Sequence, residues 1–272
     1  MIPYWKSIVI IIVLLFVQAW CDLALPAYTS NIIDVGIQNN GIEHVVPEAL
    51  TAEEFETAKC MMTEEEESTW ESIYDKDGDV YRLNVTSETE LDDLDELFAV
   101  SLIMNYQMSA MEETAVKELV AEQTGTDVST LDNVSIEDLG TMLGVELKSF
   151  PQEKEDDDGN TVTVNCVDIR PVFAGMLEKG MLDKDTILSM RESMQKTIDT
   201  MGNSLVKSMG IAYAAACDKA AGIDVEKIQK TYLVTAGLKM VGMALLIGIV
   251  TVLVGFFASR VGAGIGKTLR EK

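Results

Sequence analysis

Two long apolar segments lie near the ends of the chain, and they constrain its fold more than any other feature. The first covers residues 7–33 and carries a single charge, Asp22, while the second covers residues 240–258 and carries none. A bilayer core is about 30 Å thick, so a helix needs about 20 apolar residues to cross it. Because unpaired backbone groups cannot be left in lipid, each segment is predicted to be a helix. The sequence therefore predicts a membrane hairpin with a domain between its two helices.

The distribution of charge predicts how this hairpin is oriented. The net charge is −24, and residues 34–230 alone contain 15 Lys or Arg against 43 Asp or Glu residues. Basic residues lie instead beside the helix ends, at Lys6, Arg260, Lys267, Arg270 and Lys272. The positive-inside rule counts such flanking charges and largely ignores long loops. We therefore expect a multi-pass protein of the cell membrane, with both termini cytoplasmic and residues of about 37–230 outside.

Four parts follow from this topology. Residues 1–36 form the cytoplasmic N-terminus and first membrane helix, 37–230 the acidic extracytoplasmic domain, 231–259 the second membrane helix, and 260–272 the start of a cytoplasmic extension. A cleaved signal peptide is the main alternative for the first helix, but its apolar core would span only 7–15 residues. The two apolar helices make the lipid bilayer the expected partner of the chain. An acidic surface disfavours binding of nucleic acid by the outer domain. The partner of that domain stays unknown.

The outer domain is predicted to be mainly helical, of the α+β class, with a small hairpin or sheet. Thr51 and Thr63 are each predicted to cap a helix, and Glu54 stands three positions after Thr51, the spacing of a capping box. Residues 64–67 are four glutamates, which we interpret as a solvated helix start favoured by the helix dipole. Residues 73–81 place β-formers on both sides of a glycine turn, which predicts a hairpin.

Further along the chain, residues 153–160 are predicted to be a charged loop and residues 161–169 a strand. The longest helical pattern then recurs every three or four residues, at Ile187, Met190, Met194, Ile198, Met201 and Leu205. This spacing predicts one amphipathic helix, bent near Gly202. A methionine stripe can serve as an adaptable binding surface, but at helical spacing it is more often core or helix pairing.

Cysteine and histidine usage gives no metal site. Cys21 lies in the first apolar segment, and the other three cysteines are far apart, at Cys60, Cys166 and Cys217. One disulfide among those three stays open, although the pattern favours solitary buried thiols. The single histidine, His44, has no neighbouring Cys or His, so no metal ligand is predicted.

The chain also lacks the constellations that enzymes need. There is no nucleophile–base pair, paired acid site or phosphate cradle, so we predict no catalytic or cofactor-binding residue and no enzyme in this chain. Residues 262–268 look like a phosphate loop, but Val261 stands where that motif needs glycine. The better interpretation is a small-residue face, with Gly262 and Gly266 allowing close helix contact.

Polar residues of the first apolar segment are the candidate functional residues. Asp22 is costly in lipid, and such residues usually face protein or water. One interpretation is an aqueous transport path lined by Asp22, with Gln18 one turn earlier and Asn31 near the exit; the other is that Asp22 reaches water near the outer interface. Pro26 should kink the helix or end its regular part, and Gly36 is a candidate C-terminal stop.

Particular motifs add a family resemblance. Residues 23–26 (LALP) and 31–37 (NIIDVGI) resemble the end of the first membrane helix in bacterial ABC exporters of the multidrug type. Residues 258–266 (ASRVGAGIG) and 269–272 (LREK) resemble the cytoplasmic end of their second helix. Residues 221–224 (AGID), with the following Ile-Gln pair, look like the approach to that helix in members with a large outer insertion.

What the resemblance implies is the N-terminal portion of a longer exporter subunit that moves small molecules or peptides. Such proteins carry six membrane helices per subunit, swapped between two subunits in a homo- or heterodimer, and a nucleotide-binding domain that uses ATP and Mg²⁺. The cytoplasmic end of helix two would then include Arg260, Gly262, Gly266 and Arg270. The alternatives are a two-helix receptor with an extracytoplasmic sensor domain, which the absence of proline from residues 260–272 disfavours, and a membrane-held adhesion or scaffold domain.

Overall fold

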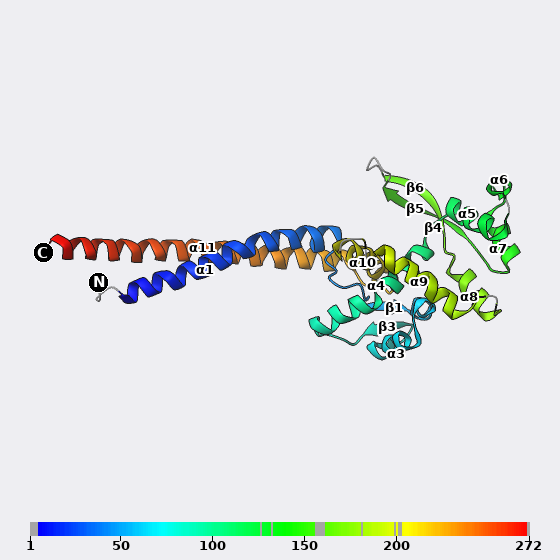
Figure 1. Ribbon diagram of the computed structural model, residues 1–272, viewed down its shortest axis with the longest axis horizontal. Helices are drawn as coiled ribbons and strands as arrows, with labels where there is room; N and C mark the ends of the chain where they lie inside the picture. The colour runs from blue at the N-terminus through cyan, green and yellow to red at the C-terminus, as the bar shows by residue number, and fades with distance from the viewer. Residues whose placement is uncertain are drawn as a thin grey trace. The chain divides into compact units, whose positions relative to one another are not determined.

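The computed structural model describes residues 5–125, 127–131, 133–155, 161–180, 182–198, 200 and 203–270. The chain is mostly helical and divides into two compact units (Figure 1). The hairpin unit combines Met1–Glu43 with Asp224–Lys272, and the second unit, named the outer unit after the location expected from the sequence, is His44–Ile223.

Two helices dominate the hairpin unit and run alongside each other (Figure 1). Helix α1 (Trp5–Asn31) continues into a π-helical segment, η2 (Ile32–Gln38), and α11 (Val225–Arg270) has 46 residues. The spans Trp5–Gln38 and Val225–Gly264 are long and apolar enough to cross a membrane, by length and composition. At 1.5 Å per residue α11 is about 69 Å long, more than twice the thickness of a hydrocarbon core.

The end of the first apolar helix differs from the prediction. The α-helix is not ended by Pro26 but continues to Asn31, because a proline removes only one ladder hydrogen bond and α11 packs along the helix. Gly36 is not the stop either, since it lies inside η2. The chain turns after it, where Asn40 and Gly41 adopt φ angles of 53° and 79°. The kink expected at Pro26 stays a prediction.

Gly36 instead allows the two segments of the hairpin unit to approach closely. A β-carbon at this position would lie 2.6 Å from Leu233 Cδ2. The side-chain amide of Gln229 donates a hydrogen bond to the Gly36 carbonyl at 2.9 Å. Gly41 is similarly close, because its β-carbon would lie 2.9 Å from the Gln229 Cα. Gly36, which the sequence suggested as a helix stop, therefore serves the close approach of η2 to α11.

The outer unit contains a three-stranded antiparallel sheet with the order β1-β3-β2, formed by β1 (Ala49–Thr51), β3 (Val80–Leu83) and β2 (Tyr74–Asp77). The predicted hairpin is confirmed: Gly78 forms its turn with φ 66°. Helices α2 (Ala52–Ala58) and α3 (Glu64–Ile73) flank the 3-10 turn η3 (Lys59–Met61). Both predicted caps are present, since Thr51 Oγ1 accepts from Glu54 N and Thr63 Oγ1 from Glu66 N.

A second antiparallel sheet has the order β4-β6-β5, formed by β4 (Met111–Glu112), β6 (Thr161–Val167) and β5 (Ser149–Glu155). Residues 153–155 were predicted as loop and are strand, because each pairs with a β-forming residue of β6. Residues 156–160 lie outside the described residues. Four helices complete this region, namely α5 (Glu113–Thr124), α6 (Val128–Leu131), α7 (Ile136–Leu143) and α8 (Arg170–Glu178).

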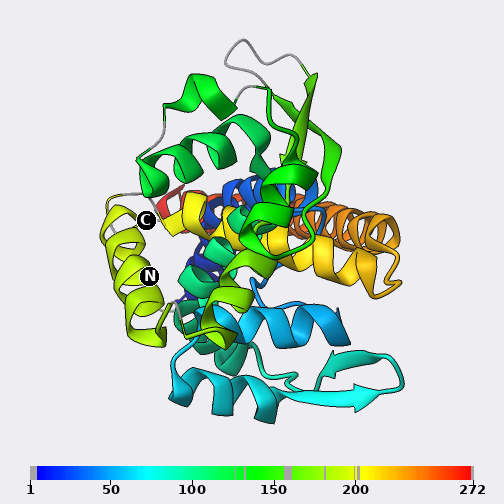
Figure 2. The ribbon, with the colours of Figure 1, turned by 90° about the vertical axis from the view of Figure 1, so that its right-hand side faces the viewer.

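Three longer helices lie between the sheets: α4 (Glu88–Ser109), α9 (Lys184–Ile198) and α10 (Asn203–Ala220) (Figure 2). The single helix predicted over residues 187–205 is therefore two helices, and Met201 and Gly202 lie outside the described residues. The core interpretation of the stripe is confirmed for Ile187 and Ile198, which are buried. Met190 is exposed, so the stripe is not buried throughout.

Candidate functional site

The predicted transport-path residues all lie on α1, but not on one face. Gln18 and Asp22 are four residues apart and share a face of the helix. Asn31 follows Asp22 by about two and a half turns, which places it on the opposite side. Asp22 and Asn31 are exposed and Gln18 is half-buried. Only the first two can therefore contribute to one polar track.

The hairpin unit has an apolar exterior. The exposed fraction of the residue reaches 74% at Phe16, 79% at Leu23 and 72% at Val252. Soluble monomers rarely expose contiguous apolar surface of this kind. The exterior is compatible with lipid around both helices.

At the C-terminal end of α11, the predicted small-residue face is open. Arg260, Gly262, Gly266 and Arg270 are all exposed. A β-carbon at either glycine would meet nothing within 4 Å. Within the part of the chain that the structure describes, the close helix contact expected at these glycines is not formed.

A charged cluster of the outer unit lies around His44 and helix α4. His44 Nδ1 is 3.0 Å from Asp95 Oδ2, and His44 Nε2 is 3.3 Å from Glu88 Oε2. The hydrogen bond to Asp95 raises the pKa of His44 above its usual value, against the lowering effect of burial. Lys207 Nζ, from α10, lies 3.0 Å from the same Asp95 oxygen. The other oxygen of Asp95 accepts a hydrogen bond from Val45 N at 2.7 Å.

A cavity of about 530 Å³ opens beside this cluster. Asp92, Asp95, Glu96 and Lys207 supply its charged wall, and the rest is largely aliphatic. Asp92 Oδ1 is 3.9 Å from Lys207 Nζ. The volume falls in the range of small-ligand sites, which typically combine an apolar lining with a few convergent polar groups.

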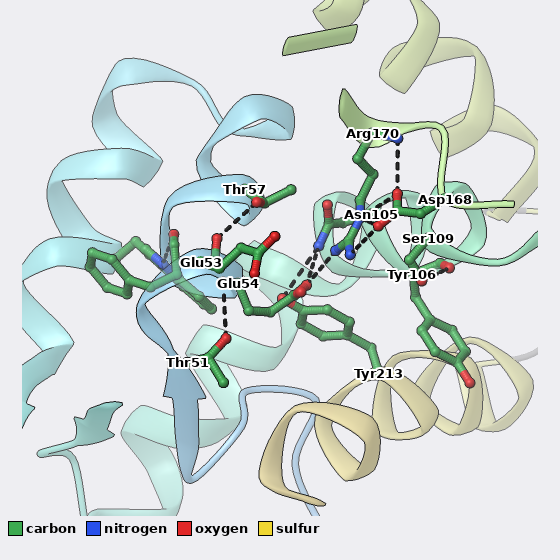
Figure 3. Close-up of polar contacts among 12 residues, drawn as sticks. Thr51, Glu53, Glu54, Thr57, Asn105, Tyr106, Ser109, Asp168, Arg170 and Tyr213 are labelled. Atoms are coloured by element: carbon green, nitrogen blue, oxygen red, sulfur yellow. Dashed lines mark hydrogen bonds and ion pairs between the residues drawn. The ribbon is translucent and has the colours of Figure 1, made fainter. Parts of the chain in front are cut away.

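A second polar network is structural (Figure 3). Arg170 donates to Glu54 at 2.6 Å and to Asp168 at 2.8 Å, and Asn105 Nδ2 donates to the same Glu54 oxygen at 3.0 Å. Burial lowers the pKa of Arg170, but the two carboxylates raise it further, so the guanidinium stays charged. The Glu54 backbone amide bonds to Thr51 as predicted, while its carboxylate ties α2 to Arg170 at the start of α8.

The glutamate run at the start of α3 is only partly solvated, which corrects its prediction. Glu64 and Glu65 are exposed, but Glu66 is 6% exposed and pairs with Arg191. Glu67 pairs with Lys184. Both cations come from α9, more than 100 residues further along the chain, so the local sequence did not reveal them.

The four cysteines are free. Of the three thiols predicted to be solitary and buried, Cys166 and Cys217 are buried, whereas Cys60 is only half-buried; Cys21 is buried as well. Burial raises the pKa of the Cys217 thiol well above its usual value, which disfavours the nucleophilic thiolate form. Its neighbour Asp218 is 1% exposed and accepts a hydrogen bond from Ala49 N at 2.9 Å. Burial raises the pKa of Asp218 to about 7.

No protein-family model, curated protein or solved structure matches this chain. The two apolar helices make the chain a candidate membrane protein by length and composition. The cluster around His44 is the functional candidate that sequence reasoning missed. Its contacts join residues 44 and 51 positions apart, and the only sequence signal was that the chain has one histidine.

Proposed function

We propose that this chain is the N-terminal membrane-spanning portion of an ATP-driven ABC exporter subunit. Helices α1 and α11 would cross the cell membrane with both termini in the cytoplasm, and His44–Ile223 would lie outside. The observation that carries this proposal is the pairing of two apolar helices as one unit, with the polar His44–Ile223 unit inserted between them in the sequence.

The motifs that resemble ABC exporters lie at the end of the first apolar helix and near the C-terminal end of the second. The motif at 31–37 coincides with the end of α1 and most of η2, and its Gly36 is where the backbone meets Leu233. The motif at 258–266 lies near the C-terminal end of α11, where both of the exposed glycines leave room for another helix. Such open faces are expected of a hairpin that packs against further helices.

In the complete exporter, ATP and Mg²⁺ would act in a nucleotide-binding domain outside this chain, and a second subunit would be the partner. Gln18 and Asp22 are the residues we assign to the transport path for small molecules or peptides. An exposed carboxylate in a membrane helix is expensive unless water or protein surrounds it. A water-filled path between helices would surround the Asp22 carboxylate with both water and protein.

Membrane topology tests the first half of this proposal. In a chain whose four native cysteines are replaced by alanine, single cysteines at Lys6, Lys76 and Arg260 are labelled in intact cells with a membrane-impermeant maleimide. We expect label at position 76 alone, and at positions 6 and 260 only after permeabilisation. Label at position 6 in intact cells would reject the orientation.

The coding sequence that follows Lys272 tests the second half. A third membrane helix after a long cytoplasmic excursion, and later a nucleotide-binding domain, supports the exporter. A soluble signalling domain would instead support the alternative, a two-helix receptor with an outer sensor domain. ATP-driven uptake of a fluorescent small molecule into inverted vesicles, compared with vesicles lacking the protein, then measures the activity directly.

A further inference from the structure

The outer unit brings the chain's single histidine together with two aspartates. His44, Asp92 and Asp95 each offer a ligand atom, and these atoms lie within 4.8 Å of one another. Imidazole nitrogen and carboxylate oxygen are ligands that zinc accepts at about 2.0–2.2 Å. Small shifts of side-chain rotamers would bring the three atoms to those distances, because the exposed Asp92 is free to adjust.

The ring of His44 already has the kind of carboxylate partner that orients histidine ligands in metal sites. Nδ1 faces Asp95, while Nε2 lies 3.3 Å from the Glu88 carboxylate. A carboxylate on the second ring nitrogen holds the proton there and leaves the first nitrogen's lone pair for a metal. Glu88 thus acts as a positioning residue for His44.

A positive charge already lies beside the two aspartates. The Lys207 ammonium lies 3.0 Å from an Asp95 oxygen and 3.9 Å from an Asp92 oxygen. Its side chain is 42% exposed, so it can move into solvent when another cation arrives. The cavity of about 530 Å³ reaches Asp92, Asp95 and Lys207, and it gives a metal ion both access and space for water ligands.

We propose that His44, Asp92 and Asp95 form a binding site for one zinc ion, which displaces the Lys207 ammonium from the two carboxylates. The imidazole favours zinc over magnesium and calcium, which prefer oxygen ligands alone. Lys207 is then an internal competitor that lowers affinity. This site is independent of the proposed transport function.

Zinc binding to the full chain in detergent micelles tests this site. The protein carries an affinity tag without histidine and a Cys60→Ala background, because Cys60 is the half-buried thiol. After removal of metals with a chelator, zinc chloride is titrated by calorimetry, and bound zinc is measured by elemental analysis after gel filtration. We expect one zinc per chain.

Three variants and a control distinguish the site from zinc scattered over an acidic surface. His44→Gln should lower affinity by more than about 100-fold, and Glu88→Gln by about 10-fold, the range typical of an outer partner. Lys207→Met should raise affinity several-fold. Glu90→Gln, an exposed carboxylate of the same helix, is the matched control and should leave affinity unchanged.

Zinc should also shift the ring proton resonances of the one histidine, which need no further assignment. Asp92→Asn serves as a second ligand variant, because the exposed Asp92 is the least embedded of the three and its loss should not unfold the chain. Equal affinity in His44→Gln and the parent would overturn the proposal. So would a Lys207→Met chain that binds zinc no more tightly than the parent.

Discussion

Gly36 and Leu233 lie in direct contact across the hairpin unit, with room for no side chain between them. A β-carbon on Gly36 would come within 2.6 Å of Leu233 Cδ2 and 3.3 Å of Tyr232 Cδ1. The Gln229 side chain bonds the Gly36 carbonyl on the same side. This contact closes the end of the hairpin where η2 leads toward the outer unit, so it should decide how rigid that end is.

Gly36→Val should therefore loosen the end of the hairpin. The added isopropyl group, whose β-carbon alone would lie 2.6 Å from Leu233 Cδ2, forces the neighbouring helix to shift, which typically costs about 1–3 kcal/mol. We expect faster hydrogen–deuterium exchange of the amides of residues 37–41. The control is Gly262→Val, where a β-carbon meets nothing within 4 Å. Equal exchange in the two variants would contradict the packing role.

Arg170→Met should destabilise the outer unit far more than the loss of an exposed ion pair would. Arg170 and Glu54 have side-chain exposures of 14% and 18%, so the change leaves a largely buried carboxylate unpaired. Breaking such a pair costs about 3 kcal/mol or more. Thermal and urea unfolding of the full chain in micelles, followed by circular dichroism, measures the loss.

Arg82→Met provides the matched comparison, because the Arg82–Asp77 pair is exposed at 53% and 67%. Exposed pairs contribute about 0–1 kcal/mol. Adding Glu54→Gln to Arg170→Met should recover part of the stability, since no buried charge then stays uncompensated. Equal losses in the two single variants would show that Arg170 acts only as another surface charge.

Much of the fold was predictable because its signals are local. Capping residues such as Thr51 and Thr63 determine helix starts within three positions, and a Gly with positive φ determines the hairpin turn at Gly78. The apolar spans are similarly local, since their length alone predicts membrane helices.

The errors arose where distant residues decide the structure. Glu66 was predicted to be solvated, but Arg191 compensates its burial. The charged segment at 153–155 is a strand because β6 pairs with it. His44 had no metal spacing in sequence, yet folding brings it to Asp95. No local pattern encodes these partners, so the candidate site was invisible until the chain was folded.

Thiol reactivity should separate the cysteines by burial. Iodoacetamide added to the native chain in micelles should modify Cys60 first, because the other three thiols are buried. Cys217 should react only after unfolding, since burial both shields it and disfavours its thiolate. Peptide mass spectrometry measures the order, with a urea-unfolded sample as the control. A disulfide-linked peptide would contradict the free thiols.

Asp218 should make the outer unit less stable as the pH rises. The pKa of Asp218 is about 7 in the folded chain, against its usual value of 3.8, which holds in the unfolded chain. The folded chain therefore binds more protons between these values, so the stability that Asp218 contributes is present below about pH 4 and lost as the pH rises through 7. The total loss is on the order of a few kcal/mol.

Asp218→Asn removes this dependence and keeps an oxygen to accept the hydrogen bond from Ala49 N. Every other titrating group is shared by the two chains, so the difference in unfolding free energy between them isolates Asp218. We expect Asp218→Asn to gain stability relative to the parent between pH 5 and pH 8, measured by urea unfolding in micelles. A difference that stays constant over that interval would mean that the carboxylate is already charged in the folded chain at pH 5.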